Sequence, residues 1–219
     1  MTPEQIQTNK ETFIATCREH IKREGLENVL KYLEKGDFYT APTSTKFHLN
    51  EPGGLCLHSL NVFHTALTLA EHVWKPAVQS GVSPFNELPN TESIAICALF
   101  HDFCKIGFYH EGERFRKDEN GRWYTHLCYN VKDSFPFGHG EKSCFLVERF
   151  MRLTPDELLA IRWHMGMFET GEQGSATRFA FYNALEMYPL VAILHSADFL
   201  SSNLLEKTTN LEELVVSRK

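Results

Sequence analysis

The sequence lacks CxxC pairs, long apolar runs and any apolar segment at its start. Its six cysteines form no CxxC pair, and most lie inside apolar stretches, as reduced core thiols do. No run approaches the roughly 20 apolar residues that a membrane span requires. The opening residues, MTPEQIQTNKE, have no apolar core of the kind found in secretory signals. We therefore expect a cytoplasmic protein that makes no contact with a membrane.

An excess of positive charge is also missing. The chain has 22 Lys and Arg against 28 Asp and Glu, a formal net charge of −6. This balance disfavours long nucleic acid as a partner, because such binding draws on clustered Lys and Arg. A small anionic substrate held by a metal remains compatible with it. The sequence has no internal repeat and no alternation of strand and helix patterns, which excludes Rossmann and P-loop folds.

What the sequence does contain is enough apolar surface for a large core. Its 219 residues are 42% hydrophobic and 23% charged, a globular balance. A folded chain of this size buries about 70% of its unfolded surface, so it needs no disulfide or zinc to stabilise it. We expect a single domain over residues 1–219.

Apolar residues at helical spacing predict an all-α bundle. Helices are expected over 3–23, 26–35, 55–79 with a bend near Pro76, 91–105, 140–151, 154–166, 176–186 and 189–205. The helices within 1–36 precede a helical core over 50–205. Within that core, aromatic and β-branched residues around Asn120-Gly121 predict an inserted β-hairpin at about 108–130, closed by a two-residue turn.

The adjacent residues His101 and Asp102 are the first chemical feature, in the apolar stretch ALFHDFCK. A buried, ionised Asp is costly unless it is paired or binds a metal. Imidazole and carboxylate together offer one nitrogen and one oxygen to a divalent ion. The pair alone is a weak indication, since such dipeptides occur by chance. The other segments contain four further polar residues of this kind, His58, His139, His164 and Asp198. All of them except His139 lie inside apolar helical runs.

The order His58, His101-Asp102, Asp198 resembles the H…HD…D pattern of the HD-domain superfamily of metal-dependent phosphohydrolases. The resemblance covers about residues 50–205, and Lys105 matches the HD-x-x-K form common in that family. It implies an HD-like helical bundle in which each of these polar positions lies on its own helix.

With His139 and His164 added, the set resembles the subset of the family that binds two metal ions. Carried over by position, the resemblance implies that one ion is held by His58, His101, Asp102 and Asp198. The other is held by Asp102, His139 and His164, so that Asp102 bridges the two. Four imidazoles and two carboxylates favour Mn, Fe, Co, Ni or Zn over Mg or Ca.

These ligands predict a phosphatase or phosphodiesterase acting on a small phosphorylated metabolite or a nucleotide. Two ions ~3.5–4 Å apart activate a water as hydroxide and polarise the phosphate. Lys105, four residues after His101, is expected on the same helical face, where it would contact phosphate oxygens. The alternative is a solvated lysine at a helix end. Arg178, at the end of the loop after His164, is a second candidate phosphate contact.

Other interpretations remain open at this point. The same ligand set resembles that of HD-type mixed-valent di-iron oxygenases, which use O₂. A non-catalytic metal- or nucleotide-binding module and a helical protein with chance histidines are further alternatives. His195 is expected to support the site or to lie in the core, and His48 fits no ligand spacing, which predicts a surface or packing role. The hairpin is expected to act as a lid, with a solvated ribbon as the alternative.

Overall fold

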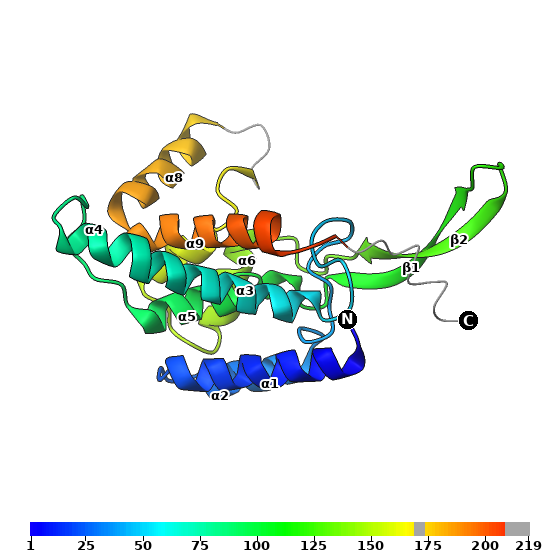
Figure 1. The fold of residues 1–219 in the computed structure, drawn as a ribbon, viewed down its shortest axis with the longest axis horizontal. Coiled ribbons are helices and arrows are strands. Elements are labelled where there is room, and N and C mark those ends of the chain that lie inside the picture. The colour runs from blue at the N-terminus through cyan, green and yellow to red at the C-terminus, as the bar shows by residue number, and fades with distance from the viewer. Residues whose placement is uncertain (169–173, 209–219) are drawn as a thin grey trace.

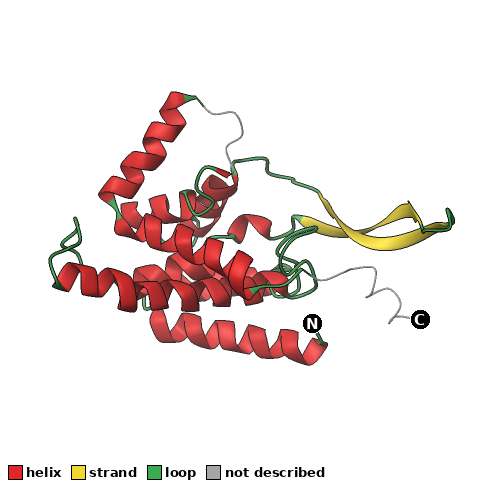
Figure 2. Ribbon diagram, turned by 45° about the horizontal axis from the view of Figure 1, so that its top comes forward, coloured by secondary structure: helices red, strands yellow, loops and turns green. Residues whose placement is uncertain are grey.

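A computed structural model describes residues 1–168 and 174–208 of the chain. In these residues the protein is mostly helical and carries one two-stranded sheet (Figures 1 and 2). The prediction of a helical bundle with an inserted hairpin is therefore confirmed. Residues 169–173, part of the loop after His164, lie outside the described residues.

The helices follow the predicted order, and most of them end earlier than predicted. They are α1 (Pro3–His20), α2 (Leu26–Lys35), α3 (Gly54–Leu69), α4 (Lys75–Gln79), α5 (Thr91–Phe100), α6 (His139–Glu148), α7 (Pro155–Arg162), α8 (Ser175–Met187) and α9 (Pro189–Leu200). Three short helical turns add to them: π-helical turns at Ala70–Trp74 and Ser201–Leu205, and a 3₁₀ turn at Phe103–Lys105.

Local capping fixes where several helices begin. Before α5, the Asn90 side-chain oxygen accepts the Glu92 backbone N–H at 3.0 Å. Before α7, the Glu157 carboxylate accepts the Thr154 N–H at 2.9 Å, and Pro155 occupies the first turn. These bonds satisfy backbone donors that a helix start leaves without intrahelical partners.

The helix α5 lies at the centre of the bundle. Every residue from Ser93 to Phe100 is buried. The helices α1, α3, α7 and α9 pack around it (Figure 1). A helix that is apolar on all sides belongs in the interior. The His101-Asp102 pair, which directly follows α5, therefore starts inside the protein rather than at its surface.

The segment predicted as one helix over 55–79 with a bend near Pro76 is interrupted shortly before that proline. A π-helical turn, Ala70–Trp74, separates α3 from α4. Pro76 has no N–H, and its ring conflicts with the carbonyl of the residue four positions earlier, His72. A proline and a π-helical turn are both recognised causes of helix kinks.

The hairpin consists of β1 (Tyr109–Lys117) and β2 (Trp123–Val131), paired antiparallel with Tyr109 opposite Val131. The predicted two-residue turn is wrong. Asp118 and Arg122 close the loop with a backbone hydrogen bond of 2.9 Å, leaving three residues between them, and Gly121 has φ +76°. The Asp118 carboxylate accepts the N–H groups of Asn120 and Arg122, which stabilises this longer turn with its left-handed glycine.

The hairpin projects away from the helices as an arm (Figures 1 and 2), and none of its described residues lines the cavity at Lys105 and His139 or the one at His164 and Asp198. The expectation of a lid is therefore not met in this conformation. At its base, the Tyr109 hydroxyl donates to the Thr43 carbonyl at 3.1 Å. This contact ties the base of the arm to the loop before α3, so the position of the base is set by tertiary contacts.

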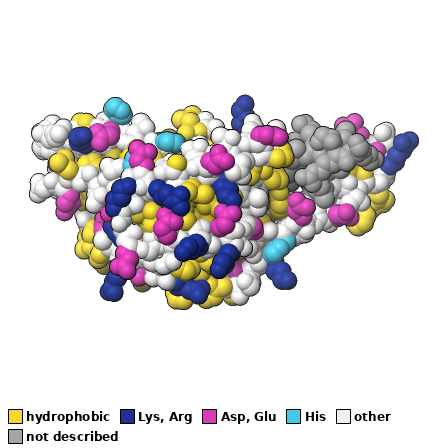
Figure 3. Space-filling model, turned by 90° about the horizontal axis from the view of Figure 1, so that it is seen from below, with side chains coloured by type: hydrophobic (Ala, Val, Ile, Leu, Met, Phe, Trp, Pro, Cys, Tyr) yellow, Lys and Arg dark blue, Asp and Glu magenta, His cyan; other side chains and the backbone are white. Residues whose placement is uncertain are grey.

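The face seen from the side of α1 and α2 mixes acidic and basic side chains without a patch of one sign (Figure 3). This matches the small net charge of the sequence. Among the described residues, no helix is both long and apolar enough to span a bilayer.

Candidate metal centre

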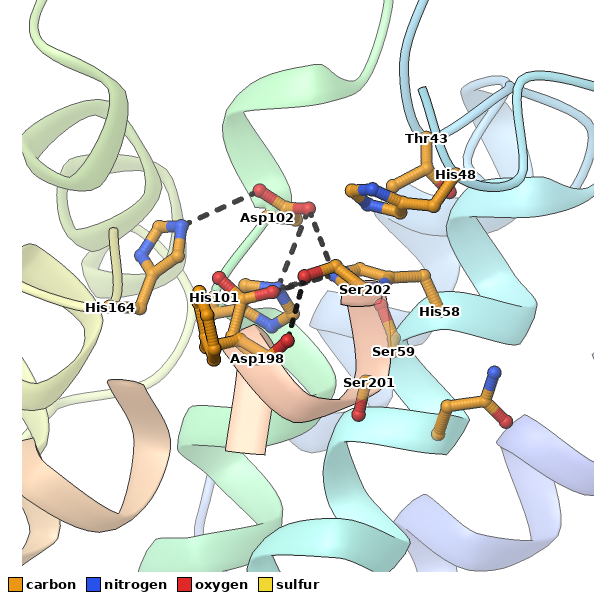
Figure 4. Close-up of polar contacts among 12 residues, drawn as sticks. Thr43, His48, His58, Ser59, His101, Asp102, His164, Asp198, Ser201 and Ser202 are labelled. Carbon is orange, nitrogen blue, oxygen red and sulfur yellow. Dashed lines mark hydrogen bonds and ion pairs between the residues drawn. The ribbon is translucent and has the colours of Figure 1, made fainter. Parts of the chain in front are cut away.

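The structure brings all six predicted ligands to one place, five of which are labelled in Figure 4. His58 lies on α3, His101 and Asp102 follow α5, His139 begins α6, His164 follows α7, and Asp198 lies on α9. Four of these residues have at most 2% of their surface exposed, namely His58, His101, Asp102 and His164. The helical core thus gathers side chains that are spread over about two thirds of the sequence.

Asp102 is the centre of the cluster, and its two carboxylate oxygens face different imidazoles. Oδ1 lies 2.8 Å from His139 Nε2 and 3.6 Å from His164 Nε2. Oδ2 lies 3.4 Å from His101 Nε2 and 3.6 Å from His58 Nε2. The two oxygens of Asp102 therefore face two separate pairs of imidazoles.

Asp198 completes the Oδ2 side of the cluster. Its Oδ1 lies 3.2 Å from His58 Nε2, and the His58 and His101 Nε2 atoms lie 3.2 Å apart. His58, His101 and Asp198 therefore present three ligand atoms within 4.8 Å of one another. His101, Asp102 and His164 form a second such group.

The proton positions of the imidazoles fit a metal. Nδ1 of His101 faces the Ala98 carbonyl at 2.8 Å, and Nδ1 of His164 faces the Ile161 carbonyl at 2.6 Å. A carbonyl only accepts hydrogen bonds, so each Nδ1 carries the proton and each Nε2 directs a lone pair into the cluster. Buried His164 Nε2 has no hydrogen-bond partner among the described residues. Lone pairs that converge on carboxylates need a cation between them, supplied either by a metal or by protons on the imidazoles.

The electrostatics of the cluster keep its carboxylates charged. Burial alone would raise the pKa of Asp102, but the Lys105 ammonium and the neighbouring imidazoles hold it well below its usual value. Burial would also raise the pKa of Asp198, but His58 and the other imidazoles outweigh this effect and lower the pKa. Against its own burial, Glu206 and Asp198 raise the pKa of His58 to about 10. The cluster therefore holds a proton on His58 when no metal is bound, and a metal must displace protons to enter.

Lys105 is near the cluster, but not by the predicted route. The expected continuation of the helix to residue 105 is wrong, because α5 ends at Phe100 and a 3₁₀ turn follows. In this tighter turn Lys105 reaches Asp102, three residues earlier, with Nζ 2.7 Å from Oδ2. The attraction between the buried carboxylate and the ammonium favours this local fold, and Lys105 still lines a cavity beside His139.

Two other predicted residues lie outside the cluster. His195 donates from Nδ1 to the backbone carbonyl of His164 at 2.7 Å, so it supports a neighbour and offers no ligand atom to the groups above. Arg178 is exposed on α8 and lines neither of the two cavities next to the cluster. The structure does not bring Arg178 to the site.

The sequence analysis missed three residues that lie against the predicted ligands. Glu206 contacts His58 Nδ1 at 3.0 Å through each of its oxygens. Cys104 Sγ lies 3.2 Å from His139 Nδ1. The ring of His48 lies 5.1 Å from that of His58, so the packing that His48 provides is at the edge of the cluster. His48 and Glu206 lie in connecting segments, so no helical spacing relates them to the other ligands. Cys104 was missed because its apolar neighbours suggested a core thiol.

Cavities open on both sides of the cluster. One of about 440 Å³ is lined by His48, His164, His195 and Asp198, with Phe47, Phe168 and Phe199 among its apolar residues. The other, of about 290 Å³, is lined by Lys105, His139, Lys142 and Cys104, with Phe108 and Phe137. A small molecule could therefore approach the ligands from either side.

Gly140 allows α6 to approach the end of α7 closely enough to bring His139 toward His164. A Cβ at this position would lie 2.2 Å from the Arg162 carbonyl oxygen.

Gly140→Ala is therefore expected to lower the free energy of unfolding by about 1–3 kcal/mol and to weaken binding of the ion next to His139. Urea unfolding in EDTA and metal stoichiometry check this. Gly174→Ala is the control, because a Cβ there meets nothing within 4 Å. Unchanged stability of Gly140→Ala would contradict the packing argument.

A comparison with known families decides the classification. Residues 57–203, about two thirds of the chain, match the model of the HD domain. The chain belongs to the HD domain family. HD domains form a superfamily of metal-dependent phosphohydrolases that bind divalent metals. The His/Asp groups described above are consistent with the metal site of that family. No curated protein and no solved structure matches the chain.

Proposed function

We propose that this HD domain is a phosphohydrolase that binds two divalent transition-metal ions and cleaves a phosphate ester in a small metabolite or a nucleotide. The observation that carries the proposal is the division of Asp102, whose two oxygens face two separate pairs of imidazoles. When bound, such ions lower the pKa of a water and polarise a phosphoryl oxygen.

The residues of the chain divide into two sets in this proposal. His58, His101, Asp198 and Asp102 Oδ2 would hold one ion, and His139, His164 and Asp102 Oδ1 the other. The imidazole-rich donor set suits Mn, Fe, Co, Ni or Zn. The backbone carbonyls of Ala98 and Ile161 hold His101 and His164 in the tautomer that a metal requires. The burial of these side chains keeps them ordered before any ion arrives.

Lys105 is proposed to offset charge on the phosphate. Lys105→Met is expected to leave the metal content unchanged and to lower kcat by about 10²-fold, the cost typical of losing one preorganised donor. Metal analysis and steady-state kinetics check this. Lys142→Met is the matched control: it lines the same cavity, but its ammonium pairs with Asp133 at 2.6 Å and not with a proposed metal ligand. Loss of metal from Lys105→Met would show instead that Lys105 serves only to hold Asp102.

The proposed reaction is tested by a substrate panel. Protein stripped of metal is reloaded separately with Mn, Co, Ni, Fe or Zn and assayed for phosphate release from nucleotides and phosphorylated metabolites. We expect release to depend on the added metal and to be absent from Asp102→Asn. A loaded protein that releases no phosphate from any substrate, or one that contains iron and instead consumes O₂, would contradict the proposal.

A further inference from the structure

A short segment beyond the family match folds back onto the cluster. The match ends at residue 203, and Glu206 follows the π-helical turn Ser201–Leu205. Next to it, the Leu49 N–H donates to the Lys207 carbonyl at 2.9 Å, and His48 forms an antiparallel bridge with Thr208. The loop before α3, which also precedes the match, therefore holds this segment in place.

Glu206 carries a buried carboxylate directed at His58. Its side chain is 1% exposed, and both oxygens lie 3.0 Å from His58 Nδ1. Asn61 donates a further hydrogen bond to Oε1 at 3.0 Å, and His48 Nε2 lies 3.8 Å from Oε2. Removing a carboxylate from water is costly unless its partners compensate. The partners here belong to α3 and to the loop before it, which makes the contact a built feature of the fold.

We infer that Glu206 is a positioning residue for the metal centre, which fixes His58 as a ligand from outside the HD match. The inference rests on the proposed function, since it assigns His58 Nε2 to an ion. A carboxylate on the far nitrogen of a ligating histidine sets the tautomer and ring orientation and raises the basicity of the ligating nitrogen. His101 and His164 receive only neutral carbonyls at this position. Cys104 Sγ, 3.2 Å from His139 Nδ1, is a weaker partner than a carboxylate. We therefore expect the ion held by His58 to be the more tightly bound of the two.

A separate cation site at Glu206 is the competing explanation. His48, His58 and Glu206 do present ligand atoms within 4.8 Å of one another. However, His58 Nδ1 faces an acceptor that has no proton to give, so Nδ1 must carry the proton and has no lone pair for a second cation. A metal would therefore bind His58 at Nε2, in place of the proton held there in the metal-free protein, and Nε2 faces Asp198. The geometry therefore favours an orienting role.

The test measures metal affinity rather than catalysis. Co²⁺ or Zn²⁺ binding to the full chain is titrated against a chelator for the wild type, Glu206→Gln and Glu206→Leu. We expect the first equivalent to bind about 10- to 100-fold more weakly in Glu206→Leu. Glu206→Gln, which keeps the size and an acceptor oxygen but removes the charge, should fall between. Glu71→Gln, on the exposed π-helical turn, is the control and should bind like the wild type.

A second readout follows the histidine itself. In the metal-loaded wild type, the His58 Nδ1 proton should give a strongly downfield NMR signal that is absent from Glu206→Leu. Thermal unfolding in EDTA checks that each variant folds. If Glu206→Leu does not fold, the metal affinity of Glu206→Gln alone tests the inference. If the wild type binds no metal, both the function and this inference fall. If the wild type binds and both Glu206 variants bind as tightly, the inference is wrong while the function stands.

Discussion

Asp102→Ala is expected to remove both ions from the protein. Each carboxylate oxygen of Asp102 faces its own pair of imidazoles, so neither proposed ion keeps a complete ligand set without it. Metal content measured by mass spectrometry should fall from two equivalents toward none. Because bound metal supplies several kcal/mol of transition-state stabilisation, kcat/KM should fall by about 10³-fold or more.

The matched variant for this experiment is Asp102→Asn, which keeps the volume and one acceptor oxygen. Asp102→Ala also leaves the Lys105 ammonium without the oxygen that lies 2.7 Å away, at a cost of up to about 3–5 kcal/mol in stability. Circular dichroism and thermal unfolding in EDTA separate a folded, metal-free protein from an unfolded one. Two equivalents of metal retained in either folded variant would refute the bridging role.

His139→Ala is expected to leave one ion bound. His139 contacts Asp102 at Oδ1, and its side chain is the most exposed of the proposed imidazole ligands, at 25%. The His58, His101 and Asp198 group does not include it. Metal content should fall to one equivalent, and kcat should drop by about 10²–10³-fold, as for the loss of one stabilising group.

His72→Ala is a suitable control for His139→Ala because His72 is exposed on the π-helical turn after α3. It should retain two equivalents. Loss of both ions from His139→Ala would mean that the two positions fill only as a unit, and the proposed partition would then be wrong.

The helical core of the site could be predicted because its polar residues, apart from His139, interrupt apolar runs. His58 and Asp198 stand on buried helical faces, and a buried polar group requires a partner. Their assignment to one metal site came from the resemblance of their order to the HD pattern. The apolar pattern also predicted α5 as a buried helix, which places His101 and Asp102 in the interior.

The other features of the site depend on tertiary contacts, which no regular spacing in the sequence predicts. Glu206 looks like an ordinary charged residue after an apolar helix, and only the folded chain shows it against His58. His48 reaches the same place through a loop. The end of α5 at Phe100 follows from the attraction between Lys105 and Asp102 and from packing around them, neither of which local helix propensity describes. The direction of the hairpin arm is likewise set at its base, by Tyr109 and Thr43.

Anomalous diffraction from crystals of the metal-loaded protein would show directly whether two ions bind on either side of Asp102. We expect two peaks. One is enclosed by His58, His101, Asp102 and Asp198, and the other by Asp102, His139 and His164. Data collected above and below the absorption edge identify the element. A single peak between His48 and Glu206, or no peak within reach of Asp102, would contradict this assignment.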